Sequence, residues 1–159
     1  MIFVTVGTHP EQFYRLIKKI DIIAPNIKEK IIIQRGFTSY IPKNCKSFEF
    51  SPSLEEYYKK AHLVIAQSAT SLIEFILKYK KPVITVPRQK RFKEHLNDHQ
   101  IEFALFMQEK TGIKAILNID DLTPALLKNY KKHAILKEDS LKKFQLYFIK
   151  LFEKLENEK

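Results

Sequence analysis

The chain has 159 residues, of which 45% are hydrophobic, so it is long enough to form one domain with an ordinary core. Its formal charge is +10, from 28 basic and 18 acidic residues, which favours anionic partners: nucleic acid, acidic membrane faces or phosphorylated small molecules. No apolar run approaches the roughly 20 residues of a membrane span, and the first residues lack signal-peptide features. The single cysteine, Cys45, excludes an internal disulfide, so we expect a cytoplasmic protein.

The excess of lysine is spread along the predicted helices. No arginine–glycine tract and no zinc-finger spacing accompanies it. A solvated, lysine-rich surface is therefore a better interpretation than a nucleic-acid interface, and we predict no nucleic-acid partner.

The first apolar run, residues 2–6, predicts a strand that ends at Gly7. Thr8 and Glu11 have the spacing of a capping box, so a helix is expected to begin here after a tight turn. The free backbone N–H groups at such a helix start would form an anion site.

Two further strands are predicted at residues 30–34 and 47–50. A helix over about residues 54–60 follows the second of them, and Ser53 with Glu56 has capping-box spacing at its start.

The stretch from residue 61 to residue 100 organises the chain. Residues 63–66 are typical of a strand buried on both faces, and the small hydroxyl residues at 68–71 come directly after it. A helical pattern then runs as far as Pro82, and residues 83–86 predict another strand. This is a strand–helix–strand unit of the length that a parallel crossover needs.

The last part of the chain is predicted to be mostly helical. A helix through residues 101–106 ends at Gly112, a strand follows at 114–117, and Thr123 with proline behind it predicts a helix start. A final helix over about residues 140–157 carries an apolar seam that must pack on the domain's own flank or on a partner. The seam consists of Leu141, Phe144, Phe148, Leu151 and Leu155.

Alternating strands and helices predict a single α/β domain with a doubly wound, mostly parallel, Rossmann-like sheet. Its core covers about residues 1–120, and the C-terminal helices about 123–157. In such folds ligands bind at the carboxyl ends of the strands, where Gly7, residues 34–36, residues 68–71 and Arg88 gather.

Several polar side chains near these strand ends are candidate ligands. Glu74, one turn into a helix, either accepts hydrogen bonds from a ribose diol or is a surface glutamate near a helix start. Arg88 either neutralises phosphate or is a solvated charge. His9 is a phosphate contact or a turn residue, and the turn is favoured. His62 is interpreted as structural.

A second group of candidates lies further along the chain. His99 and Gln100, flanked by Asn97 and Asp98, either bind sugar hydroxyls or cap a helix. No cysteine or histidine cluster has metal-ligand spacing, and no nucleophile–base pair is visible. The pattern favours a protein that holds a ligand without an evident catalytic base.

Several stretches resemble the C-terminal, nucleotide-sugar-binding domain of glycosyltransferase family 28, the family of MurG. The likeness is strongest to its single-domain members, which include the catalytic subunit of the split eukaryotic N-acetylglucosamine transferase and the PssE-type exopolysaccharide proteins. It covers nearly all of residues 1–120. The stretches that carry it are residues 3–8, 33–36 and 61–65, Glu74, and residues 81–88 and 94–100.

This resemblance implies one half of a GT-B fold that binds a UDP-sugar without a metal or other cofactor and inverts the anomeric carbon. It implies that Glu74 holds the ribose hydroxyls and that His99 and Gln100, beside Asn97, contact the donor sugar. The diphosphate would face the strand ends and their loops, with Arg88 as a candidate counter-charge; the loop residues are Gly7, Thr8, Gln67, Ser68, Thr70 and Ser71.

The same resemblance implies a membrane-associated partner of PssD type, the N-terminal half of the GT-B fold. That partner would supply the lipid-linked acceptor and the catalytic base, and would recruit this chain to the inner face of the membrane. The C-terminal amphipathic helix would be the docking element.

One stretch departs from the family pattern. Where the family has histidine followed by a glycine-rich loop, this chain has Ala66, Gln67, Ser68, Ala69 and Thr70. Either the Ser68 and Thr70 hydroxyls replace the backbone contacts to phosphate, each worth roughly 1 kcal/mol, or the side chains narrow the pocket.

Two functions therefore follow from the sequence. The first is the donor-binding catalytic subunit of a two-component hexosyltransferase for cell-surface polysaccharide. The alternative is a non-catalytic accessory subunit that stabilises a membrane-associated glycosyltransferase.

Overall fold

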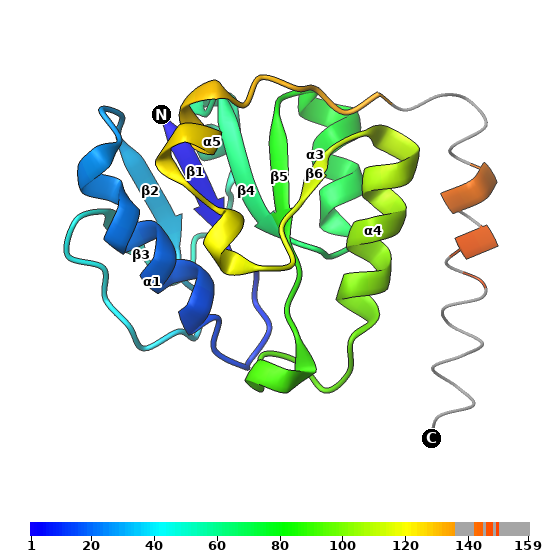
Figure 1. Cartoon of the computed structure of the whole chain (residues 1–159), viewed down its shortest axis with the longest axis horizontal. Coiled ribbons are helices and arrows are strands. Elements are labelled where there is room, and N and C mark those ends of the chain that lie inside the picture. The colour runs from blue at the N-terminus through cyan, green and yellow to red at the C-terminus, as the bar shows by residue number, and fades with distance from the viewer. Residues whose placement is uncertain (136–141, 145, 148, 150–159) are drawn as a thin grey trace.

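The computed structural model describes residues 1–135, 142–144, 146, 147 and 149, and Figure 1 shows the chain. A six-stranded sheet has the order β3-β2-β1-β4-β5-β6, and all its neighbouring strands are parallel. The predicted doubly wound α/β fold is therefore confirmed. The strands are β1 (Ile2–Thr5), β2 (Ile31–Gln34), β3 (Lys46–Phe48), β4 (Leu63–Gln67), β5 (Val83–Val86) and β6 (Lys114–Ala115).

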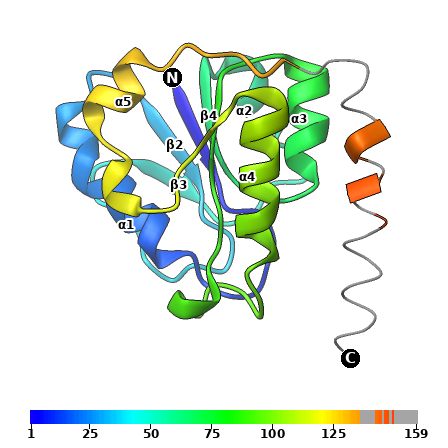
Figure 2. The same cartoon turned by 45° about the vertical axis from the view of Figure 1, so that its right-hand side comes forward.

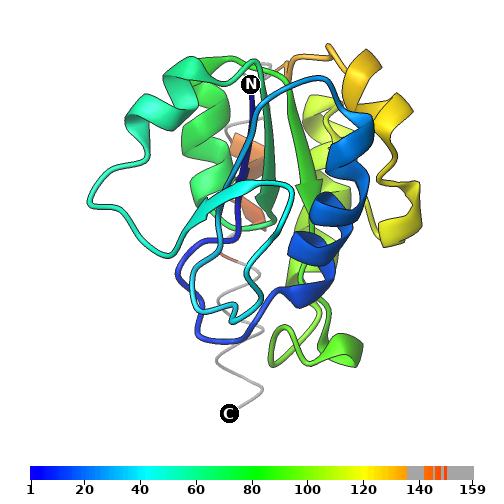
Figure 3. The same ribbon diagram turned by 90° about the vertical axis from the view of Figure 1, so that its left-hand side faces the viewer.

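Helices cover both faces of this sheet. Helix α1 (Tyr14–Ile23) and α5 (Pro124–Asn129) lie on one face, and α2 (Glu55–Lys60), α3 (Ser71–Tyr79) and α4 (His99–Thr111) lie on the other. Figure 2 shows α1 and α5 opposite α3 and α4, and Figure 3 shows the sheet between α1 and α3 nearly edge-on. Short 3-10 helices span Ala24–Asn26, Lys90–Phe92 and Ile119–Asp121.

The strands are apolar on both faces because both faces are buried. In β1, Ile2 and Val4 face the α1 side, and Phe3 faces the other side. All three side chains are fully buried. Such continuous apolar runs are typical of parallel sheets covered by helices on both sides.

The predicted start of the first helix is wrong. Helix α1 begins at Tyr14, and no side chain caps it, so Thr8 and Glu11 do not form a capping box. Glu11 Oε2 instead lies 2.5 Å from Nδ1 of His9. The backbone N–H of Phe13 donates to Thr38 Oγ1 at 2.9 Å, so this donor just before the helix is used within the fold.

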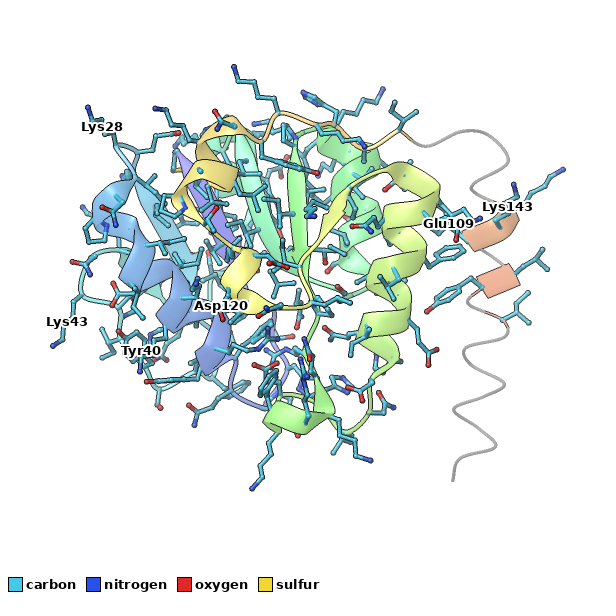
Figure 4. The ribbon with its side chains drawn as sticks, viewed as in Figure 1. Lys28, Tyr40, Lys43, Glu109, Asp120 and Lys143 are labelled. Atoms are coloured by element: carbon cyan, nitrogen blue, oxygen red, sulfur yellow. The ribbon has the colours of Figure 1, made fainter. Side chains whose placement is uncertain are left out.

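The loop between β2 and β3 is fastened to α1 by one buried carboxylate. Asp21 accepts hydrogen bonds from the Tyr40 hydroxyl at 2.7 Å and from the backbone N–H groups of Lys43 and Asn44 at 3.0 and 2.6 Å. Burial raises the pKa of Asp21, but these bonds outweigh it and leave the pKa below its usual range. Figure 4 shows Tyr40 and Lys43 beside α1.

In the last third of the chain, the predicted helix end at Gly112 and the predicted helix start at Thr123 are confirmed. Gly112 ends α4 with φ +74°, and the Thr123 hydroxyl accepts from the backbone N–H of Leu126 at the start of α5. Residues 142–144, 146, 147 and 149 are helical. Of the predicted seam, Phe144 is buried against Phe106 of α4; the rest of the seam lies outside the described residues.

Candidate functional site

The carboxyl edge of the sheet, where the strands end, is hollowed beside the predicted loops. A cavity of about 320 Å³ lies at the ends of β1 and β4. These two strands are neighbours, and from them the chain proceeds to β2 on one side and β5 on the other. Ligands of doubly wound folds bind at such a topological switch point. Its walls are Thr5, Gly7, Thr8, Leu54, Tyr58, Ala66, Gln67, Ala69, Ser71, Leu72 and Phe75.

A second cavity, of about 220 Å³, adjoins the first between α2 and α3. The two share the side chains of Leu54, Tyr58, Ser71 and Phe75. We call them together the carboxyl-edge groove. Tyr58 packs against Phe75 with ring centroids 5.0 Å apart, which gives the groove an aromatic wall.

Glu74 lines the smaller cavity of this groove. It lies in the first turn of α3, and its side chain is exposed. Within the described part of the chain, no hydrogen bond or ion pair to its carboxylate is found. The carboxylate is therefore open to a ligand in the groove.

The turn after β1 is held in a conformation that only glycine adopts readily. Gly7 has φ +71°, and a Cβ atom there would lie 2.0 Å from Nε2 of Gln67. Gln34 fixes this turn, because its amide accepts from the Gly7 N–H at 3.1 Å and donates to the Gly7 carbonyl at 3.0 Å. Gln67 thus fills the space beside Gly7, while Thr8 borders the groove.

The small hydroxyl residues after β4 lie in three different environments. Ser68 is 1% exposed, and its hydroxyl lies 2.7 Å from Thr85 Oγ1, so it is turned into the core and does not face the groove. Thr70 is exposed but lines neither cavity. Ser71, by contrast, lines both. In the described structure the backbone N–H groups of Thr70 and Ser71 have no hydrogen-bond acceptor, so α3 begins with free donors.

Arg88 is a buried structural cation. It is 1% exposed, so the interpretation of Arg88 as a solvated charge is wrong. Its guanidinium donates to Gln67 Oε1 at 2.6 Å and to the carbonyls of Val6, Glu11 and Glu94 at 2.9, 2.7 and 3.2 Å. Burial lowers its pKa to about 10 although Glu94 and Glu11 oppose the change. In this arrangement Arg88 joins the loop after β1, the end of β4 and the loop before α4.

The three predicted sugar contacts lie around the start of α4 and line neither cavity. Gln100 is 3% exposed, and its Oε1 accepts from the backbone N–H of Arg88 at 3.0 Å, so its amide is committed to the fold. Asn97 Oδ1 contacts Nδ1 of His99. His99 is half-buried, and burial lowers its pKa.

Sequence reasoning missed the residues that hold this edge together. Glu94 is 3% exposed and forms two hydrogen bonds with Arg15, both 2.9 Å long. His95 lies between His9 and His99, with ring centroids 4.3 and 4.5 Å away. Glu94 and His95 stand inside a stretch that carried the resemblance, but nothing in their spacing predicts contact with residues 9–15, some 80 positions earlier.

The family model of the glycosyltransferase family 28 C-terminal domain matches residues 1–155, nearly the whole chain. The chain belongs to glycosyltransferase family 28. Among individually curated proteins, none matches this family 28 chain at a significant level.

A solved structure has the same fold as this family 28 domain. It is the crystal structure of MurG from Acinetobacter baumannii, with a TM-score of 0.53 and 16% sequence identity. The match covers 78% of this chain and 38% of the MurG chain. The domain therefore has the Rossmann-like fold of one part of a GT-B glycosyltransferase and spans well under half of MurG's length.

The described residues of this family 28 domain contain no helix that is both long and apolar enough to cross a membrane. They also contain no group of three or more histidine, cysteine, aspartate or glutamate side chains placed to hold a metal ion. Independence of metal stays a prediction.

Proposed function

We propose that this chain is the donor-binding catalytic subunit of a two-component inverting glycosyltransferase, which adds a hexose from a UDP-sugar to a lipid-linked glycan in cell-surface polysaccharide synthesis. The observation that carries the proposal is the carboxyl-edge groove at the β1–β4 switch point, with Glu74 at one end and the free start of α3 between its two cavities. Membership of family 28 supports it.

The groove fits the nucleoside part of such a donor. The open carboxylate of Glu74 accepts hydrogen bonds from the two ribose hydroxyls, and bonds to a charged acceptor are worth about 1.5 to 3 kcal/mol each. Tyr58 and Phe75 offer an aromatic surface along the same groove.

The diphosphate is assigned to the start of α3. The free N–H groups of Thr70 and Ser71, the Ser71 hydroxyl and the positive end of the helix dipole favour an anion there. Thr8 faces the same cavity from the loop after β1. This arrangement uses backbone donors and needs no metal. His99 remains the proposed donor-sugar contact, since Gln100 is occupied within the fold.

In this proposal a second polypeptide supplies the acceptor. The match covers 38% of the MurG chain, and the partner proposed for the remainder is a PssD-type half that is associated with the membrane. That half holds the lipid-linked acceptor and brings this cytoplasmic chain to the inner face of the membrane. The +10 charge is assigned to a solvated surface, and no nucleic-acid role is proposed.

Binding of UDP to the full chain, measured by isothermal titration calorimetry, tests the site. We expect Glu74→Gln to weaken UDP binding about 30-fold or more, because both ribose hydrogen bonds lose their charged acceptor. The 2′-deoxy analogue dUDP sharpens the test. Losing the 2′-hydroxyl should weaken binding to the native chain several-fold and leave binding to the Glu74→Gln chain almost unchanged.

Glu109→Gln is the matched control, since Glu109 is an exposed glutamate on α4 that pairs with Lys110. It should bind UDP like the native chain. If neither the chain nor its complex with the partner bound UDP, the donor-binding role would be wrong. If UDP bound but sugar transfer by the complex survived Glu74→Ala, the accessory role would be favoured instead.

A further inference from the structure

A carboxylate–imidazole pair lies on the carboxyl edge outside the residues assigned above. Glu11 Oε2 is 2.5 Å from His9 Nδ1, and both atoms are shielded from solvent. The imidazole of His9 also packs against that of His95, with ring centroids 4.3 Å apart and the ring planes tilted by 32°. The loop after β1 and the loop before α4 therefore hold this ring from two sides.

The contact with Glu11 determines what the ring offers. A carboxylate beside Nδ1 favours the tautomer whose proton is on Nδ1, so that the lone pair is on Nε2. No hydrogen-bond donor to Nε2 of His9 is found in the described part of the chain. A neutral imidazole oriented by a carboxylate, with Nε2 unoccupied, has the arrangement of a general base.

This ring lies next to the proposed donor site. Thr8, its neighbour in the chain, and Gly7 both line the larger cavity of the carboxyl-edge groove. The diphosphate and the sugar bond that breaks are assigned to this end of the groove. An acceptor hydroxyl approaching that bond from the open edge of the sheet would arrive beside the loop that carries His9.

We propose that His9, oriented by Glu11, is the general base of the transfer reaction, an inference that rests on the proposed function. The acceptor oxygen forms its bond to the anomeric carbon as the bond from that carbon to the diphosphate breaks. The diphosphate leaves with the electron pair as UDP, and the proton of the acceptor hydroxyl moves to Nε2 of His9. The base then belongs to this chain, whereas the resemblance to family 28 places it on the partner half.

The charges around His9 suit this role. Burial lowers the pKa of His9 below its ordinary value, Glu11 partly opposes this, and Arg88 lowers the pKa further. The facing His95 is itself held neutral, since burial and its basic neighbours lower its pKa to about 4. His9 is therefore unprotonated at neutral pH and able to accept a proton.

The test uses membranes that contain the full chain with its PssD-type half, and follows transfer of labelled hexose from UDP-glucose and from UDP-N-acetylglucosamine to lipid. We expect His9→Gln to lower kcat at least 100-fold with little change in the KM for the donor or in UDP affinity. Glu11→Gln should lower kcat less. His62→Gln is the matched control and should leave kcat unchanged. His62 is an exposed histidine just before β4, at the opposite edge of the sheet, and it contacts Glu29.

The pH profile separates a base from a merely structural histidine. In the native complex kcat should fall on the acid side, with an apparent pKa below 6.5, because protonated His9 cannot accept a proton. The small residual activity of His9→Gln should lose this acid limb.

Three results would overturn the inference. If UDP binding is normal and His9→Gln transfers at the native rate, His9 is not the base, and the proposed function stands. If His9→Gln loses UDP affinity in step with kcat, the residue serves binding or folding instead. A native chain that binds no UDP overturns the proposed function and this inference together.

Discussion

Arg88 and Gly7 show how single residues fix the candidate site. Arg88 donates a hydrogen bond to Gln67, and the Gln67 amide occupies the space that a side chain at position 7 would need. A buried guanidinium needs several acceptors to offset its loss of hydration, and the carbonyls of the neighbouring loops provide them. The shape of the groove thus depends on residues that do not face a ligand.

Gly7→Ala is expected to weaken UDP binding at least 10-fold. A Cβ at φ +71° costs about 1 kcal/mol in backbone strain, and it also forces the amide of Gln67 away from its place beside Arg88 and the groove. Calorimetric titration with UDP and urea denaturation measure the two effects separately.

Gly112→Ala provides the matched comparison. Gly112 has nearly the same φ, +74°, but lies at the end of α4, where a Cβ would meet only the flexible side chain of Lys132. It should lose a similar amount of stability and bind UDP normally. Equal UDP affinity in both variants would show that Gln67 moves aside at no cost to the site.

At the scale of elements, the C-terminal helix packs on the domain's own flank through the part that the structure describes. Phe144 is 3% exposed, with its ring 5.3 Å from that of Phe106, and Tyr147 stacks on Phe106 at 4.4 Å. Leu146 and Ile149 are exposed on the same helix. Phe144 of the apolar seam thus packs within the chain. The proposed docking of the partner would involve exposed residues of this helix such as Leu146 and Ile149.

We expect Phe144→Ala to lower the free energy of unfolding by about 3 kcal/mol, because a buried aromatic side chain is lost from a well-packed site. Leu146→Ala, at an exposed position of the same helix, should change it by less than about 0.5 kcal/mol. Urea denaturation followed by circular dichroism measures both. Equally small effects would mean that this helix does not pack on α4 in solution.

For the whole molecule, the decisive feature is that the chain has the fold of one part of a GT-B glycosyltransferase. The chain supplies a switch-point groove and spans 38% of the MurG chain with which it shares its fold. In the proposed function donor binding and acceptor binding lie on separate polypeptides, and transfer depends on their association.

The full chain by itself is expected to bind UDP but to transfer no sugar to lipid. Adding the PssD-type half should restore transfer, measured as labelled hexose in a lipid extract. The complex made with Glu74→Gln serves as the negative control. Transfer to lipid by the chain alone would contradict the division into two components.

The amino-acid sequence by itself determined the order of strands and helices, the parallel sheet and the placing of the candidate loops at the ends of the strands. Apolar runs such as residues 2–6 and 63–66, broken by glycine, proline and polar residues, suffice for this, because they reflect local burial and chain direction.

Only the tertiary structure decided which side chains face the groove. It turned Ser68 into the core, opened Ser71 and Glu74 to the groove, buried Arg88 and brought His9 against His95. These outcomes depend on contacts between residues far apart in the chain, and on which of the available hydrogen-bond partners each polar group meets when water is excluded. Local spacing carries no information about either.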